Sequence, residues 1–389
     1  MGAFSSFQNE IYVAGLEGTR PELPTDLTRL EARAAEHLTA DAFGYVAGSA
    51  GSEGTARANR AALDAWRIVP RLLRDVSTPE LTTTVLGTQM PAPVALAPIG
   101  VLGIVHPDGE SAVARAAASL GLTMVVSSAA TTTMEDVAAA AGQGPRWFQL
   151  YWSRDRDVAV SFIERAAAAG YGALVVTLDT FSLGWRPRDL DNAFLPFLTA
   201  VGHENYLTDP AFLRSVGGAV TDENRIAAIL HWAATFGNPT LTWDDLAFLR
   251  DHWNGPIALK GIQHVDDARR AADAGMDGIV VSNHGGRQVD GAIGSLAALP
   301  PIVEAVGGRL EVLFDSGIRT GADVVKALAL GARAVLVGRP YVYGLGLAGE
   351  AGVRHVLRCL LAELELTMTL SGAARLSDLT PELLVRADR

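Results

Sequence analysis

The chain has 389 residues, of which 49% are hydrophobic, so it is long enough to bury a large core. Its 32 basic and 43 acidic residues give a formal net charge of −11, which argues against nucleic acid and anionic membranes as partners. A small anionic substrate must therefore be held by a few locally placed cations. Cys359 is the single cysteine, which excludes a disulfide framework or cysteine-based metal cluster and suits a reducing compartment. We expect no metal site.

The sequence gives no sign of a membrane span or a signal peptide. Its longest apolar run, residues 93–105, contains prolines and glycines and is better explained as a strand with its loop. The N-terminus lacks the basic and apolar regions of a secretory signal. We therefore expect a cytoplasmic protein.

Residues 25–70 form the first region, in which apolar and charged positions recur at helical spacing. Thr25 and Asp26 are suitable N-cap residues for its start. A glycine-rich segment, residues 43–51, carries Tyr45. Taken by itself, such a segment is explained as a helix end, unless other evidence places Tyr45 over a pocket.

From residue 93 to residue 340, strand and helix patterns alternate. Alternation of this kind predicts right-handed parallel βαβ units, and eight of them predict a closed (β/α)₈ (TIM) barrel within a single domain, residues 1–389. The expected strands are 93–98, 122–127, 146–150, 172–178, 256–260, 277–281, 310–315 and 333–337. The expected helices are 109–120, 133–141, 156–169, 265–274 and 320–330, with closing helices over 341–375 that include 350–370.

One connection is much longer than the others. Residues 180–255 separate the fourth and fifth strands, far beyond an ordinary loop, and include a helical, tryptophan-bearing part over 222–253. Loops of this length are typically lids or binding loops. Near the C-terminus, residues 344–349 match GxGxxG without the strand, helix and acid that a dinucleotide site requires. We interpret that match as a tight turn that packs the last helix.

Polar and glycine residues gather where the expected strands end, which is where barrel enzymes build their active sites. These residues are Pro98, Ile99 and Gly100; Ser127; Gln149 and Tyr151; Thr177 and Asp179, followed by Arg186; Lys260; Ser282, His284 and Arg287; Asp315, Ser316, Gly317 and Arg319; and Gly338 and Arg339. The last two strand ends predict a phosphate site, because glycines expose backbone N–H groups there and two arginines supply charge. Surface ion pairs are the alternative explanation of those arginines.

The segment Ser282-Asn-His-Gly-Gly-Arg-Gln288 resembles the signature of the FMN-dependent 2-hydroxy acid oxidases and dehydrogenases, the relatives of glycolate oxidase. Residues 149–151, 177–179, 260–261 and 321–331 support the resemblance, which spans roughly residues 25–375. Within the family, residues 184–190, 206–210, 315–321 and 341–344 are most similar to lactate 2-monooxygenase. Many members have Gly where this chain has Ser316, although the monooxygenase-like pattern also carries Ser.

The resemblance implies a role for each residue at the strand ends. His284 is the expected base at the α-carbon or hydroxyl of the substrate, oriented by Asp179. Arg186 and Arg287 would clamp the carboxylate, and Tyr45 and Tyr151 would hydrogen-bond the carboxylate and hydroxyl. The expected FMN ligands are Pro98, Ile99, Gly100, Ser127, Gln149, Thr177, Lys260, Ser282, Asp315, Ser316, Gly317, Arg319, Gly338 and Arg339. Among these, Lys260 would favour the anionic reduced flavin.

The resemblance implies oxidation of L-lactate, or of a similar short L-2-hydroxy acid, with O₂ as acceptor. Because Gly100 leaves room beside the flavin and the long insertion offers a lid, we expect pyruvate to be retained and decarboxylated to acetate and CO₂. An oxidase that releases the 2-keto acid and H₂O₂ is the alternative. Flavin-free phosphate-binding isomerases or lyases and a non-catalytic flavin scaffold are the other classes considered. The resemblance also implies a tetramer or octamer.

Overall fold

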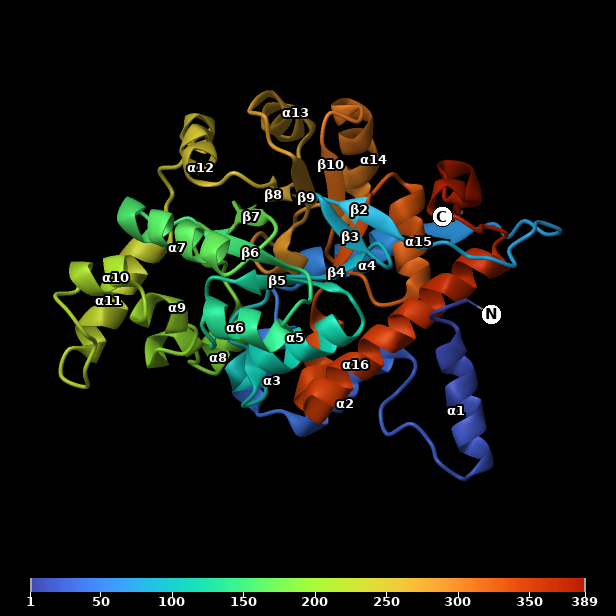
Figure 1. Ribbon diagram of the computed structural model, residues 1–389, viewed down its shortest axis with the longest axis horizontal. Coiled ribbons are helices and arrows are strands. Elements are labelled where there is room, and N and C mark those ends of the chain that lie inside the picture. Colours follow the sequence, from blue (N-terminus) through green and yellow to red (C-terminus); the bar gives the residue numbers. More distant parts are fainter. Residues whose placement is uncertain (1, 388–389) are drawn as a thin grey trace.

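The computed structural model describes residues 2–387, which are built around a closed barrel of eight parallel strands in the order β10-β11-β4-β5-β6-β7-β8-β9 (Figure 1). This confirms the predicted (β/α)₈ architecture. The strands are short, mostly apolar and largely buried on both faces, as expected of a parallel sheet covered by helices. The strands are β4 (Val94–Leu96), β5 (Thr123–Ser127), β6 (Arg146–Tyr151), β7 (Leu174–Thr177), β8 (Ile257–Ile262), β9 (Gly278–Val281), β10 (Glu311–Phe314) and β11 (Ala334–Val337).

The strand register explains why residues far apart in sequence share one end of the barrel. Ser127 on β5 pairs with Gln149 on β6, and Thr177 pairs with Tyr151 on one side and Lys260 on the other. Because the strands are parallel and aligned, their carboxyl ends open onto the same face.

A hairpin contributes apolar side chains to the interior of the barrel. Its strands, β2 (Thr83–Val85) and β3 (Thr88–Met90), supply Val85 and Met90 to the cluster that fills the barrel. The indole of Trp147 on β6 donates to the hydroxyl of Thr88 at 2.9 Å, which ties the hairpin to the strands. The interior of the barrel is therefore a core filled by side chains.

Helices follow the strands largely as predicted, with one that the sequence analysis missed. They are α5 (Gly109–Ser119), α6 (Met134–Ala141), α7 (Arg156–Ala168), α13 (Val265–Asp273), α14 (Ser295–Val306) and α15 (Gly321–Ala329). The missed helix is α14, which contains Pro300 and Pro301. Proline lacks an N–H and disrupts helical hydrogen bonding, so the sequence of this segment does not indicate a helix.

The N-terminal region lies against the barrel as short helices: α2 (Leu30–His37), α3 (Ala40–Ala47) and α4 (Gly54–Asp64). Asp26 accepts a hydrogen bond from the backbone of Thr28 and caps the 3₁₀ turn η1 (Leu27–Arg29), as predicted for this residue. Helix α1 (Ser6–Leu16) precedes this region and projects from the body (Figure 1). A two-stranded antiparallel sheet joins β1 (Trp66–Ile68) to β12 (Leu384–Arg386), which places the C-terminal segment beside the chain that follows the N-terminal helices.

The long insertion after β7 is a group of short helices on one side of the barrel (Figure 1). Its 222–253 part is two helices separated by residues 237–245. The elements are α8 (Pro187–Asp191), η3 (Pro196–Thr199), α9 (Glu204–Leu207), α10 (Pro210–Ser215), α11 (Arg225–Phe236), η4 (Trp243–Asp245) and α12 (Leu246–His252).

The GxGxxG segment is not a tight turn, contrary to the sequence-based interpretation. It lies within α16 (Arg339–Leu370), which runs along the body in Figure 1 and has a kink at Ala348 and Gly349. A Cβ on Gly344 would lie 2.7 Å from the carbonyl oxygen of Gly352, so these glycines allow the two arms of the kinked helix to approach. The remaining short elements are η2 (Leu102–Ile104), η5 (His284–Gly286), η6 (Leu376–Asp378) and η7 (Pro381–Leu383).

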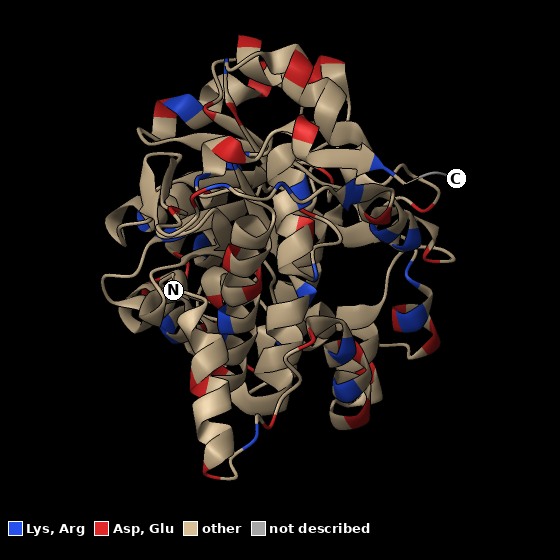
Figure 2. Ribbon diagram, turned by 90° about the vertical axis from the view of Figure 1, so that its right-hand side faces the viewer, with Lys and Arg blue, Asp and Glu red and all other residues tan. Residues whose placement is uncertain are grey.

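Charged residues of both signs are interspersed on the face shown in Figure 2. None of the helices within residues 2–387 is long and apolar enough to cross a membrane.

Candidate active site

A cavity of about 1140 Å³, including space open to solvent, lies at the carboxyl ends of the strands. It brings together residues from the carboxyl ends of all eight strands, or from the segments that follow them, and from helix α3. The predicted residues that line it are Tyr45, Pro98, Ile99, Gly100, Ser127, Tyr151, Arg186, Lys260, His284, Arg287, Asp315, Ser316, Gly317, Arg319, Gly338 and Arg339. Of the other predicted residues, Gln149, Asp179 and Ser282 bond to lining residues, and Thr177 bonds to Gln149.

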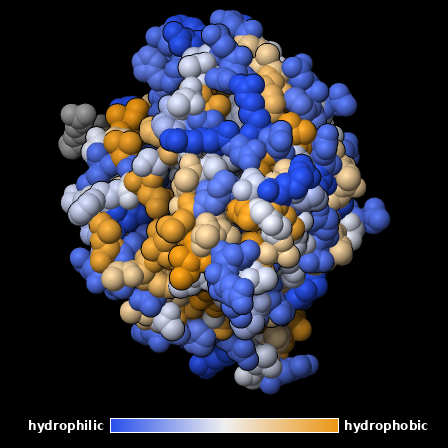
Figure 3. Space-filling model, turned by 90° about the vertical axis from the view of Figure 1, so that its left-hand side faces the viewer, coloured by the Kyte–Doolittle hydropathy of each residue, from blue (hydrophilic) through white to orange (hydrophobic). Residues whose placement is uncertain are grey.

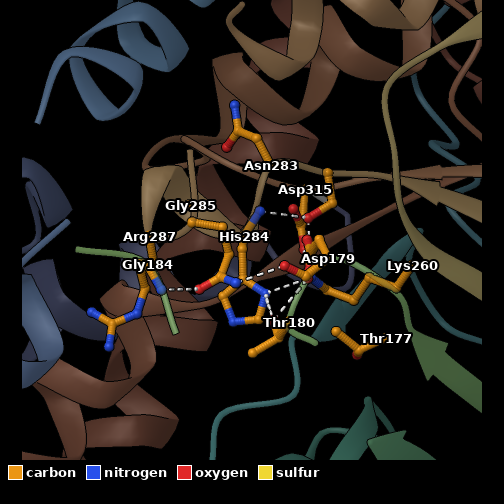
Figure 4. A network of polar contacts seen from close by, with 12 residues as sticks. Thr177, Asp179, Thr180, Gly184, Lys260, Asn283, His284, Gly285, Arg287 and Asp315 are labelled. Atoms are coloured by element: carbon orange, nitrogen blue, oxygen red, sulfur yellow. Dashed lines mark hydrogen bonds and ion pairs between the residues drawn. The ribbon is translucent and has the colours of Figure 1, made fainter. Parts of the chain in front are cut away.

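His284 and Asp179 form the central polar contact. The Nδ1 atom of His284 lies 2.8 Å from Oδ1 of Asp179, and the Thr180 hydroxyl lies within 3.2 Å of both side chains. Figure 4 shows the imidazole facing Asp179 and Thr180, with Arg287 on its other side. An ionised carboxylate only accepts hydrogen bonds, so it holds the proton on Nδ1 and leaves the Nε2 lone pair free to accept a proton.

Burial lowers the pKa of His284 below its usual 6.5, against the attraction of Asp179. The imidazole is therefore neutral at physiological pH, the state that a base requires. Burial acts on Asp179 in the opposite direction and would raise its pKa. The charges of His284 and Lys260 outweigh that effect and hold the pKa of Asp179 at about 2. Asp179 is therefore ionised beside the imidazole.

The loop that carries His284 is held in an unusual backbone conformation. His284 has a φ of 58°, and Gly285 and Gly286 follow with φ of 65° and 81°. Left-handed geometry is costly for a residue with a Cβ and persists only where the surroundings impose it. Here Asn283 forms a reciprocal pair of amide hydrogen bonds with the buried Asn59 of α4, at 2.8 and 2.6 Å. The N-terminal helices thus fix the position of His284.

Two arginines, Arg186 and Arg287, lie beside His284 without an ion-pair partner among residues 2–387. Arg186 donates to the Arg287 carbonyl at 3.1 Å and to the Gln288 side chain at 2.9 Å, while Arg287 donates to the carbonyls of Tyr45 and Gly48. Burial and the like charge of Arg287 lower the pKa of Arg186 to about 10, so Arg186 remains charged at neutral pH. Two adjacent arginines, one buried and one half-buried, are suited to binding one carboxylate.

Behind the cavity, a line of buried polar side chains connects three strands. Ser127 donates to Gln149 at 3.0 Å, and the Gln149 amide donates to Thr177 at 3.0 Å. On the next strands, Lys260 donates to Ser282 at 3.0 Å and lies 3.2 Å from the carboxylate of Asp315. Asp315 and Asp179 outweigh the effect of burial and raise the pKa of Lys260, so this buried amine is charged.

The far end of the cavity holds Arg319 and Arg339, where the sequence predicts a phosphate site. Arg319 is half-buried, and its guanidinium bonds only the Ile318 carbonyl among the described groups. Arg339, by contrast, makes several hydrogen bonds: it donates to the carbonyls of Val46, Gly48 and Gly285 and to the hydroxyl of Ser49. Arg339 therefore also joins α3 to the His284 loop, a structural role that the sequence analysis did not foresee.

Gly100 lies in the lining, but the expected space beside it is not there. A Cβ on Gly100 would lie 2.5 Å from the Ala129 carbonyl oxygen and 3.1 Å from its carbon. Glycine is needed here because another backbone approaches closely. The sequence-based argument that Gly100 leaves room for a keto acid and oxygen was therefore wrong.

Several lining or supporting residues were not identified from the sequence. Thr180 directly follows Asp179, so its position in the sequence could have identified it as a residue of the site. Asn59, Phe197 and Phe236 reach the site from distant segments, and nothing local in the sequence marks them.

A model of the family described as FMN-dependent dehydrogenase matches residues 34–386. The chain belongs to this family. It is 48% identical over 393 residues to an FMN-dependent alpha-hydroxy acid dehydrogenase of Schizosaccharomyces pombe, covering 98% of this chain and 97% of the relative. It is 43% identical over 365 residues to an L-lactate oxidase of Lysinibacillus sphaericus, covering 94% of each. A crystal structure of mandelate oxidase matches with a TM-score of 0.81 and 39% identity over 94% of this chain and 99% of that one.

The protein is thus an FMN-dependent oxidoreductase that acts on L-2-hydroxy acids. Its cavity fits FMN on chemical grounds. One end has the half-buried Arg319, which has no carboxylate partner among the described residues, and the other has buried hydrogen-bonding side chains. A flavin-free isomerase or lyase does not agree with this family membership.

Proposed function

We propose that this enzyme is an L-2-hydroxy acid oxidase that converts substrate and O₂ into the 2-keto acid and H₂O₂. The observation that carries the proposal is the His284–Asp179 contact of 2.8 Å beside two arginines that have no carboxylate partner. The names L-lactate oxidase and mandelate oxidase among the relatives support the same outcome.

The side chains of this enzyme bind the substrate and accept its proton. Arg186 and Arg287 bind the substrate carboxylate, with the Tyr45 ring stacked 4.9 Å from the Arg287 guanidinium. Nε2 of His284 accepts a proton from the substrate, and ionised Asp179 stabilises the imidazolium that results. Burial raises the pKa of Tyr151, which therefore remains a neutral hydrogen-bond donor.

FMN supplies the two-electron acceptor in this reaction, and O₂ takes up those electrons and two protons to leave as H₂O₂. FMN would be held by five side chains, those of Ser127, Gln149, Thr177, Lys260 and Arg319. The overall reaction removes one hydrogen from the α-carbon of the substrate and one from its hydroxyl oxygen. One 2-keto acid and one H₂O₂ therefore form for each substrate molecule.

Decarboxylation to acetate and CO₂, as by a lactate 2-monooxygenase, is the second candidate. The similarity of residues 184–190 and 315–321 to that enzyme favours it. The absence of the expected space at Gly100 weakens it.

The test begins with anaerobic addition of L-lactate, which should bleach the visible absorption of the bound flavin. Air is then admitted without catalase, and keto acid, peroxide, acetate and CO₂ are measured. Pyruvate and peroxide in equal amounts support the oxidase, whereas acetate with little peroxide supports the monooxygenase. His284→Gln should keep FMN bound while slowing anaerobic reduction by about 10²–10⁴-fold. Reduction at the native rate would exclude His284 as the base.

A further inference from the structure

The substrate end of the cavity has an apolar wall opposite its charged groups. Two aromatic side chains from the insertion form it: Phe197 of η3 and Phe236, the last residue of α11. The Phe236 ring lies 4.8 Å from the Tyr151 ring, and the Phe197 ring lies 6.5 Å from the Tyr45 ring. These contacts place the wall directly beside the groups that would bind the carboxylate and hydroxyl.

Among the described residues, this wall offers no free partner for a second polar group on a substrate. Other residues that line the same cavity are apolar, namely Val101, Leu102, Ile104, Val105 and Leu183. The Thr180 hydroxyl is already within hydrogen-bond distance of Asp179 and His284. Asp315, the acid in the lining, is paired with Lys260. A charged or hydroxylated substrate side chain would therefore lose its hydration without gaining a hydrogen bond.

The wall is rigidly supported from behind. Trp232 packs 5.1 Å from Phe197 and 4.6 Å from Phe236, and the His203 ring lies 4.1 Å from Trp232. Burial lowers the pKa of His203 to about 4, so this imidazole is neutral and supplies no cation to a second carboxylate.

The apolar lining continues to the mouth of the cavity. Leu183 lines the cavity and is 45% exposed, and Phe181 and Trp185 on the same loop are 56% and 73% exposed. Figure 3 views the insertion side, where apolar atoms gather around a hollowed area. The compartment is therefore open along an apolar edge, which leaves space for a substrate side chain longer than a methyl group.

We infer that Phe197 and Phe236 bind the substrate's side chain and that the enzyme selects L-2-hydroxy acids with apolar side chains of more than one carbon. This inference rests on the proposed function, because it assumes that the carboxylate lies at Arg186 and Arg287. Each added methylene that reaches the wall should raise kcat/KM by about fourfold.

The first experiment compares kcat/KM for L-lactate, L-2-hydroxybutyrate, L-2-hydroxy-4-methylpentanoate, L-3-phenyllactate, L-glycerate and L-malate. We expect values to rise from lactate to the branched acid. We expect L-malate to fall about 100-fold or more below L-2-hydroxybutyrate, because its second carboxylate has no partner. Equal values for lactate and the longer acids, or efficient oxidation of malate, would overturn the inference.

The second experiment uses Phe236→Leu and Phe197→Leu, with Phe248→Leu as the matched control. Phe248 lies on α12 of the same insertion, stacked 5.6 Å from Trp152, and does not line the cavity. Either wall variant should lower the ratio of kcat/KM for L-3-phenyllactate to that for L-lactate by about fivefold or more, and the control should leave the ratio unchanged. An equal loss with both substrates would show a merely structural role and refute the assignment.

Calorimetric binding of the 2-keto acid products separates this inference from the proposed function. 4-Methyl-2-oxopentanoate should bind more tightly than pyruvate, and Phe236→Leu should reduce the difference. If keto acids bind in this order but no 2-hydroxy acid bleaches FMN, the proposed function fails and the wall assignment stands. If bleaching occurs without any preference for apolar chains, the wall assignment fails instead.

Discussion

Replacing Asp179 with Asn tests whether the carboxylate controls the proton-accepting state of His284. The pKa of Asp179 is about 2, against an ordinary value of 3.8, although burial alone would raise it. A fall of about 1.8 in pKa corresponds to about 2.4 kcal/mol in favour of the carboxylate. Because burial opposes that fall, the attractions to His284 and Lys260 and the hydrogen bonds must together supply at least this amount.

The largest of those attractions is to protonated His284, the state formed when the base has accepted its proton. Asp179→Asn removes that attraction, which is one part of the total, so FMN reduction should slow by roughly 10- to 60-fold. The Asn amide can also donate to Nδ1, which would place the proton on Nε2 and block the base. The variant therefore affects the chemical step rather than cofactor binding.

The assay is anaerobic rapid mixing with saturating L-lactate, followed at the flavin absorption band. Bound FMN, measured by the same absorption before mixing, should match the native enzyme. Thr180→Val is the control, because it removes a hydroxyl within 3.2 Å of both side chains but leaves the charge in place. A reduction rate for Asp179→Asn within threefold of the native rate would refute this account of the pair.

Three further predictions concern pH, cofactor and stability. Since burial lowers the pKa of His284, kcat/KM should stay constant above pH 6.5 and decrease only when the pH is lowered further. A loss of kcat/KM that already begins above pH 7 as the pH is lowered would contradict this. Arg319→Ala should weaken FMN binding by about 10- to 150-fold and leave riboflavin binding unchanged in equilibrium titrations; equal losses would exclude Arg319 as a phosphate ligand. Burial lowers the pKa of His203 to about 4, so protonation of His203 favours the unfolded state. The free energy of unfolding should therefore be unaffected by His203 above pH 6.5 and should decrease as the pH falls toward 4, with a loss of about 2.5 kcal/mol at pH 4.5. His203→Phe should flatten that part of the pH dependence in chemical unfolding, and an unchanged slope would argue against it.

The sequence alone was sufficient to predict the barrel and the face that carries the cavity. Strand and helix periodicity is local, so the alternation of buried runs and amphipathic helices can be read without knowing any contact. Parallel strands then place their carboxyl ends together by topology, which is why His284, Lys260 and Arg319 were identified as neighbours. The helix with Pro300 and Pro301 was missed because tertiary packing overrides the poor helical propensity of proline.

Only the tertiary structure determined the features that depend on contacts between distant segments. The position of Gly100 against the Ala129 backbone, the amide pair of Asn59 and Asn283, and the wall that includes Phe236 all join residues whose separation in sequence carries no periodic signal. Within an insertion, an aromatic residue that supports the fold and one that lines the cavity have the same local pattern. Which of them reaches the substrate is decided by the packing of the insertion helices on the barrel.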